Sequence, residues 1–174
     1  MVLERAKRLV EAGRDVVIVI DGLSRLGRAY HAVGQAAGRQ PSSGVDVSAV
    51  HATKRWFGAG RQTDGAGTLT IVGTVSVDTN SRIDDAIADE LATVATSRLV
   101  LDARLAARRV YPAIDVEASG TSRDEVLFGA RSAAANELRR NVIDSVAAGQ
   151  AGTALEALRD RVRSSVTNSE LLGA

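Results

Sequence analysis

The chain has 174 residues, 45% of them hydrophobic and 25% charged, which is typical of a water-soluble domain of ordinary size. A net charge of +1 does not by itself indicate a nucleic-acid-binding protein, and the lack of cysteine excludes disulfides and thiolate metal sites. No apolar stretch approaches the length of a membrane span, and the N-terminus lacks the apolar core of a signal peptide. We therefore expect a cytoplasmic protein with no membrane contact.

The basic residues are almost all arginines, since only Lys7 and Lys54 are lysines. This bias is typical of a GC-rich genome, and it also suits phosphate recognition by the planar guanidinium group. A P-loop requires the pattern G-x-x-x-x-G-K-S/T, but neither lysine follows a glycine. The sequence therefore contains no standard P-loop.

The first predicted elements are an amphipathic helix over Val2 to Glu11 and a strand over Asp15 to Ile20. The aliphatic run from Val16 to Ile20 is typical of a strand buried on both faces, as in a parallel sheet. Asp21 follows it, at the edge where open α/β sheets bind ligands. Two interpretations stay open, a Mg²⁺-binding carboxylate of a nucleotide hydrolase and a simple cap of the next helix.

The remaining pattern alternates helices and strands. We expect helices over residues 23–33, 45–57 and 83–95, strands over 68–77, 98–101 and 110–116, loops over 34–44 and 58–67, and a polar turn over 78–81. Asp46 or Ser48 should lie near the N-cap of the second of these helices. Glycines at 149 and 152 interrupt Ala-rich helical stretches near the C-terminus. The predicted fold is α/β, a parallel sheet flanked by helices with a C-terminal helical tail.

Several segments occur together in a recognisable order: ERAKRLVEAGRDVVIVIDGLSRLGRAY, SSGVDVSAVHATKRWFGAGR, GTLTIVGTVSVDTNSRIDD, RRVYPAIDVEASGTSRDEVL and LRDRVRSSVTNSELL. They resemble bacterial transcription termination factor Rho, a hexameric RNA-dependent ATPase and helicase with a RecA-like motor domain. The resemblance implies that residues 1–127 are the C-terminal half of the motor and 128–174 a helical extension of the same domain. The family's RNA-binding domain and P-loop half would precede the matching region.

For the nucleotide, the resemblance assigns Asp21 to the Walker B carboxylate, which supports Mg²⁺ bound with ATP. It places Arg25 and Arg28 near the nucleotide and the subunit interface, and Arg109 likewise. The alternative for Arg25 and Arg28 is an ordinary helix residue that is solvated or ion-paired.

For RNA, the resemblance points to two segments. Residues 38–46 match the Q loop that enters the central pore of the ring, and its candidate RNA contacts are Arg39, Gly44, Val45 and Asp46. An unrelated flexible loop is the alternative. Residues 79–82 match the R loop, with Thr79, Ser81 and Arg82 as candidate contacts. Asn80 replaces the usual glycine there, and asparagine tolerates the left-handed backbone that glycine favours.

Two departures from the family pattern weaken the prediction of an enzyme. The arginine finger directly follows S-G-T in the family, but Ser122 stands there and Arg123 comes one residue later. An EEFKGTGN-like segment has become residues 89–96, without its glycines and basic residue, so we expect its helix to continue. Arg123 remains, with Asp21, a candidate catalytic residue.

The functional expectation is a Rho-like factor whose ancestral role is ATP-dependent RNA translocation in transcription termination. Its implied partners are RNA, further copies of itself or full-length Rho subunits and, indirectly, the RNA polymerase complex. Without a P-loop, we expect no ATP hydrolysis by the isolated chain, and its binding of ATP and Mg²⁺ is in doubt. Removing the P-loop half should leave one face of the sheet exposed. The alternatives are a non-catalytic assembly module or an inactive relic of a Rho motor, and a fragment of another RecA-like ATPase.

Overall fold

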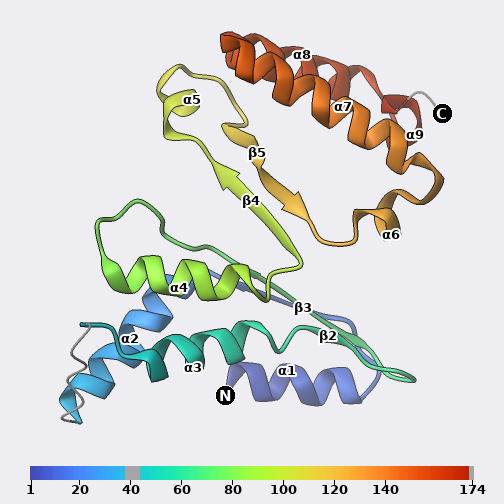
Figure 1. Ribbon diagram of the computed structural model, residues 1–174. Coiled ribbons are helices and arrows are strands. Elements are labelled where there is room, and N and C mark those ends of the chain that lie inside the picture. The colour runs from blue at the N-terminus through green and yellow to red at the C-terminus, as the bar shows by residue number, and fades with distance from the viewer. Residues whose placement is uncertain (38–43, 173–174) are drawn as a thin grey trace. The chain divides into compact units, whose positions relative to one another are not determined.

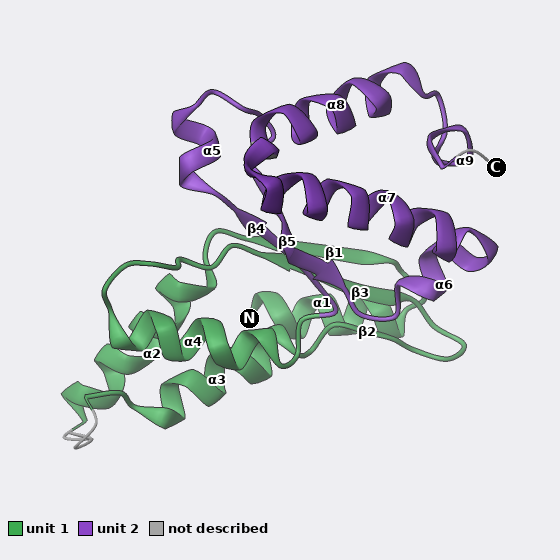
Figure 2. Ribbon diagram, turned by 45° about the horizontal axis from the view of Figure 1, so that its top comes forward, with its two compact units in different colours: residues 1–95 green, residues 96–174 purple. Residues whose placement is uncertain are grey.

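The computed structural model describes residues 1–37 and 44–172. The chain divides into two compact units, Met1–Ala95 and Thr96–Ala174, which Figure 2 colours separately. This division differs from the family-based ranges 1–127 and 128–174, which concern ancestry and stay a prediction.

The first unit places four helices against a three-stranded sheet (Figure 1). Its elements in chain order are α1 (Val2–Glu11), β1 (Val16–Ile20), α2 (Leu23–Ala36), α3 (Val47–Phe57), β2 (Arg61–Gln62), β3 (Thr68–Gly73) and α4 (Arg82–Ala92). The strand order is β1-β3-β2, with β1 parallel to β3 and β2 antiparallel to β3. The expected parallel pairing is confirmed for β1 and β3, whereas β2 lies in a stretch expected to be a loop.

The core of this unit lies on one side of the sheet. Ile18 and Leu69 pack with Ala6 and Val10 of α1. A second cluster joins α2, α3 and α4 through the buried residues Leu23, Val50, Ile87 and Leu91. The amphipathic patterns of these helices therefore converge on a single face of the strands.

The prediction that β1 is buried on both faces is wrong. Val17 and Val19 are 64% and 77% exposed, and Val72 on the neighbouring strand is 53% exposed, whereas Ile18 is buried. Ile18 packs with α1, and Ile20, on the same side of β1, packs with the cluster of α2, α3 and α4, so the alternate side chains of β1 face solvent. Figure 1 shows helices α1 to α4 on one side of the sheet. The expected exposure of one sheet face is confirmed.

The second unit begins with an antiparallel strand pair followed by helices. Its elements are β4 (Ser97–Leu101), α5 (Ala103–Ala107), β5 (Ile114–Thr121), α6 (Asp124–Phe128), a 3₁₀ turn (Gly129–Arg131), α7 (Ser132–Ser145), a π-turn (Val146–Gln150), α8 (Ala151–Ser164) and α9 (Asn168–Leu171). The expected helical tail is confirmed, and its break falls at Gly149, where φ is +81°, whereas Gly152, predicted as a second break, lies within α8. The core consists of Leu105, Val110, Ala113, Val142 and Leu155.

The orientation of β4 and β5 corrects the expectation of parallel pairing throughout. Val100 lies opposite Asp115 and Ser97 opposite Thr121, in antiparallel register. The connection between them contains only the five-residue helix α5. Such a helix rises about 7.5 Å, which is too short to carry the chain back along a five-residue strand of about 16 Å.

No helix in residues 1–37 and 44–172 is both long enough and apolar enough to span a membrane.

Candidate nucleotide and RNA sites

Asp21 lies at the carboxyl end of β1, in solvent and next to the carboxyl end of β3. Its Oδ1 accepts a 2.6 Å hydrogen bond from the hydroxyl of Thr74, the first residue after β3. Because β1 and β3 are parallel, their carboxyl ends meet at one edge of the sheet. That edge therefore carries a carboxylate and a hydroxyl in direct contact.

The start of α2 is tied to the same edge. The backbone N–H of Leu23 donates to the carbonyl of Thr74 at 2.8 Å, and the N–H of Ser76 donates to the buried Ser24 hydroxyl at 2.9 Å. Sequence reasoning missed Thr74 and Ser76. The available signal was the alternation of polar residues with valine after Gly73, which places Thr74 and Ser76 on one side of the chain.

The donor set at this edge fits a magnesium ion held together with a nucleotide. Mg²⁺ in phosphate-transferring proteins takes one or two carboxylates and keeps several water and phosphate ligands. Asp21 supplies one exposed carboxylate with a hydroxyl beside it. Among the residues with described placement, no three His, Asp or Glu side chains form a metal cage, so these residues alone offer no closed site.

Arg28, on the exposed side of α2, is committed to an ion pair. Its Nε donates to Oδ1 of Asp84 at 2.8 Å and its Nη2 donates to Oδ2 of the same carboxylate. Asp84 is fully buried, and the hydroxyl of Thr79 donates to its Oδ2 at 2.6 Å. The Arg28 hydrogen bonds hold the pKa of the Asp84 carboxyl below its ordinary value, and Thr79 adds to this. Arg28 is therefore ion-paired, and its predicted place near the nucleotide and the subunit interface stays a prediction.

The turn between β3 and α4 has an unusual backbone. Asp78 and Asn80 have φ values of 55° and 57°, so the expectation that Asn80 accepts the left-handed conformation is confirmed. Ser81 is the N-cap residue of α4 and makes no side-chain capping bond. Arg82 is the first residue of α4 and is exposed. The turn thus presents the exposed guanidinium of Arg82 next to the polar side chains of Asn80 and Ser81.

The other predicted RNA segment is only partly described. Arg39 lies outside the described residues, and Gly44 is exposed with φ of +76°. Asp46 is buried and caps α3, as expected, by accepting from the N–H of Ser48 at 2.9 Å and from its hydroxyl at 2.6 Å. Its own N–H donates to Nδ1 of His31 at 3.3 Å. RNA contact by Arg39, Gly44, Val45 and Asp46 stays a prediction.

The remaining candidate arginines are exposed and lie on different units. Arg25 is on α2, whereas Arg109 and Arg123 belong to the second unit and have φ values of 62° and 57°. Arg123 Nε lies 3.4 Å from Glu125 Oε1. Beyond Asp89 and Glu90, α4 continues only to Ala92, three residues short of the predicted helix end at residue 95.

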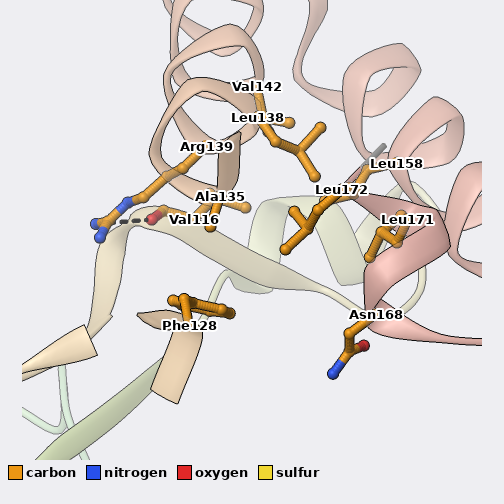
Figure 3. A pocket seen from close by; sticks show the side chains of 10 residues that line it. All are labelled: Val116, Phe128, Ala135, Leu138, Arg139, Val142, Leu158, Asn168, Leu171 and Leu172. Atoms are coloured by element: carbon orange, nitrogen blue, oxygen red, sulfur yellow. Dashed lines mark hydrogen bonds between the residues drawn. The ribbon is translucent and has the colours of Figure 1, made fainter. Parts of the chain in front are cut away.

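The second unit holds an apolar pocket of about 230 Å³ (Figure 3). Its lining consists of Val116, Phe128, Ala135, Leu138, Arg139, Val142, Leu158, Asn168, Leu171 and Leu172. Arg139 reaches from α7 to β5, where its Nη2 donates to the carbonyls of Ser119 at 2.7 Å, Glu117 at 3.2 Å and Val116 at 3.3 Å. Its guanidinium therefore fixes β5, and we assign no chemistry to the pocket.

Comparison with known proteins bears on this arrangement. The model of the ATP synthase alpha/beta family, nucleotide-binding domain, matches residues 1–121. The chain belongs to this family. Figure 1 locates the matched region from α1 to the end of β5.

Within curated proteins the similarity is to transcription termination factor Rho. The Streptomyces coelicolor protein is 44% identical over 173 residues, covering 99% of this chain and 41% of that protein. The Allochromatium vinosum protein is 40% identical over 177 residues, covering 100% of this chain and 41% of that protein. The Streptomyces lividans protein is 43% identical over 172 residues, covering 99% of this chain and 24% of that protein. This chain is a Rho homologue that spans about a quarter to two-fifths of the length of these relatives.

Solved structures confirm the partial RecA-like fold. An ATPase from the type III secretion system of pathogenic bacteria has a TM-score of 0.73 at 21% identity, covering 98% of this chain and 55% of that chain. EscN from the enteropathogenic E. coli type III secretion system has a TM-score of 0.65 at 18% identity, covering 98% and 47%. At these identities the likeness concerns the fold alone.

Proposed function

We propose that this chain is part of a Rho-type motor and supplies a sheet edge that meets the nucleotide and a turn that contacts RNA. Its ancestral role is ATP-dependent RNA translocation in transcription termination. The observation that carries the proposal is Asp21 at the end of β1, with its Oδ1 bonded to Thr74, in a chain 40% to 44% identical to Rho.

In this proposal Asp21 is the Walker B carboxylate and supports Mg²⁺ bound to ATP, directly or through water. Mg²⁺ would neutralise phosphate charge when bound. Asp21 would hold the Mg²⁺ ion in place, directly or through water. Its hydrogen bond to Thr74 fixes the carboxylate at the sheet edge. Arg25, Arg109 and Arg123 would serve nucleotide phosphates or a neighbouring subunit.

The RNA-facing residue with the strongest support is Arg82. It is exposed at the end of an ordered turn, next to the N-terminus of α4. A guanidinium presented in this way suits a phosphate of single-stranded RNA. Ser81 lies beside it, and the residues 39 and 44–46 form the second proposed contact.

The ATPase part is tested by phosphate release. We expect none from the isolated chain with poly(C) and Mg²⁺-ATP, because the sequence holds no P-loop lysine to contact the β- and γ-phosphates. Release that depends on poly(C) and disappears in Asp21→Ala, but not in the exposed-carboxylate control Asp64→Ala, would contradict this expectation.

The RNA part is tested by fluorescence anisotropy of labelled oligo(C). Arg82→Ala should weaken binding and lower the slope of log K against log salt by about 0.7, the value for one phosphate contact on a single strand. Arg5→Ala, which removes an exposed arginine from α1, is the matched control. Equal effects of the two substitutions would sink the proposed role of Arg82.

A second candidate function is non-catalytic assembly with full-length Rho subunits. The valine face formed by Val17, Val19 and Val72 favours it, since these side chains are 53% to 77% exposed. An apolar sheet face of this kind is usually covered by a partner. The homology to Rho makes a Rho subunit the partner to test.

Co-purification tests the assembly function. Tagged chain should retain full-length Rho, and Val17→Thr combined with Val19→Thr should abolish retention while preserving the fold. The control Val166→Thr changes an exposed valine of the second unit instead. A well-folded wild-type chain that retains no Rho would exclude this function and favour an inactive relic.

A further inference from the structure

Two segments of the first unit are joined by polar contacts at both of their ends. One runs from Asp21 to Arg28 and the other from Thr74 to Asp84. At the sheet edge, Asp21 bonds to Thr74 and Ser24 to Ser76. At the other end, Arg28 and Thr79 meet at Asp84. The proposed nucleotide edge and the proposed RNA turn are thus parts of one connected structure.

At the Asp84 end of this connection, both oxygens of a buried carboxylate are used as hydrogen-bond acceptors. Asp84 is 0% exposed, and both of its carboxylate oxygens accept from Arg28, with Oδ2 also accepting from Thr79. An ionised carboxylate in a protein interior must be paired and hydrogen-bonded. Its partners are therefore held where they are.

The role of Thr79 follows from the single proton that its hydroxyl can donate. A threonine hydroxyl has one proton to donate, and Thr79 donates it to Asp84 at 2.6 Å. Thr79 stands between Asp78 and Asn80, both in the left-handed conformation, which Asp and Asn tolerate and which a neighbouring tertiary contact holds in place. The bond to Asp84 is such a contact.

We propose that Thr79 and Asp84 are positioning residues, which fix the turn Asp78–Ser81 against α2, and that Thr79 is not itself an RNA contact. The consequence for RNA rests on the proposed function, because it requires Arg82 to be the contact that the fixed turn presents. The fixing of the turn does not require RNA.

The test measures amide hydrogen exchange in the full chain by NMR. The amides of Asp84 and Asp85 bond to the Ser81 carbonyl at 3.0 and 3.1 Å and report opening of the turn. Thr79→Val keeps the shape and removes the donor, so exchange of these amides should accelerate about tenfold or more. Thr79→Ser keeps the donor and should restore wild-type rates.

Two controls separate this effect from general destabilisation. Thr93→Val removes the hydroxyl that bonds to the Glu90 carbonyl at 2.7 Å, and should leave the turn amides unchanged. The amide of Val50, in the first turn of α3, should keep its rate in every variant. Asp84→Asn should also accelerate exchange at the turn, and if it fails to fold, the threonine variants still provide the answer.

The outcomes are distinguishable. Unchanged exchange in Thr79→Val would overturn the proposal, and a loss of oligo(C) affinity without faster exchange would make Thr79 an RNA contact and overturn it as well. Faster exchange together with weaker oligo(C) binding would support both the positioning role and the RNA role. Faster exchange with unchanged binding would support positioning and refute the proposed RNA function of the turn.

Discussion

Arg28 and Asp84, 56 positions apart in the sequence, form a two-pronged ion pair in which the carboxylate is fully buried and the guanidinium side chain is 51% exposed. Hydrogen bonds from Arg28, and then from Thr79, hold the pKa of Asp84 below its ordinary value of 3.8. The pair joins α2 to the start of α4, so the protonation state of Asp84 affects the stability of the first unit.

The first prediction concerns stability in acid. A carboxyl whose pKa is lower in the folded state contributes stability that is fully present above its unfolded pKa and is lost as the pH falls through the folded pKa. Asp84 therefore stabilises the unit above about pH 4 and loses this contribution below it. Urea unfolding followed by Trp56 fluorescence should show a steeper acid loss in wild type than in Asp84→Asn. Parallel pH curves for the two proteins would contradict this.

The second prediction concerns Gly27, a buried glycine within α2. A Cβ at this position would overlap Cδ1 of Ile87 and lie 3.1 Å from the Thr53 hydroxyl, and both of these side chains are fully buried. Gly27→Ala should therefore reduce the free energy of unfolding by about 1–3 kcal/mol, although alanine in an exposed helix would raise it by about 1 kcal/mol.

Ile87→Val provides the matched second-site test for Gly27→Ala, because it removes the overlapping Cδ1 atom. The double variant should be more stable in urea than the sum of the two single effects predicts. Simple additivity would show that the overlap is not the cause.

The third prediction concerns Asn80, whose φ is 57°. Asn80→Gly should leave the free energy of unfolding nearly unchanged, whereas Asn80→Val should reduce it by about 1–2 kcal/mol because a β-branched residue is strained there. Ser81→Val is the control in the same turn, since Ser81 has an extended backbone with φ of −110°. Equal losses for valine at the two positions, measured by urea unfolding, would argue against backbone strain.

The fourth prediction concerns Arg139 in the second unit. Arg139→Met removes a cation that donates to three β5 carbonyls and should reduce the free energy of unfolding by about 1–2 kcal/mol. Arg140→Met, at the exposed neighbouring position, should change it by less than about 0.5 kcal/mol. The measurement is urea unfolding followed by circular dichroism, and similar midpoints for both variants would mean that the bonds to β5 contribute nothing.

Much of the local structure was predictable from the sequence because its signals are local. The amphipathic spacing of Val2 to Glu11 matches α1, and the aliphatic run ending at Asp21 matches β1. Asp46 was recognisable as a cap and Asn80 as a left-handed turn residue. Each depends on side chains within a few positions of one another.

The errors arose where distant segments decide the outcome. The run Val16 to Ile20 is hydrophobic throughout, yet Val17 and Val19 are exposed because all four helices of the first unit pack on the other face. The two later strands pair antiparallel because α5 is too short for a crossover. The hydrophobic pattern within a strand indicates neither which face of the strand is covered nor the direction of the strand with which it pairs.

By itself, then, the sequence determined the α/β class, the helices of the first unit, its strands β1 and β3 but not β2, and the place of Asp21 at a strand end. Only the tertiary structure decided which face of β1 is buried, which hydroxyl meets Asp21, and that Arg28 and Thr79 converge on Asp84. The physical reason is that burial makes an isolated charge costly, so the partners of Asp84 are chosen by packing rather than by their distance along the chain.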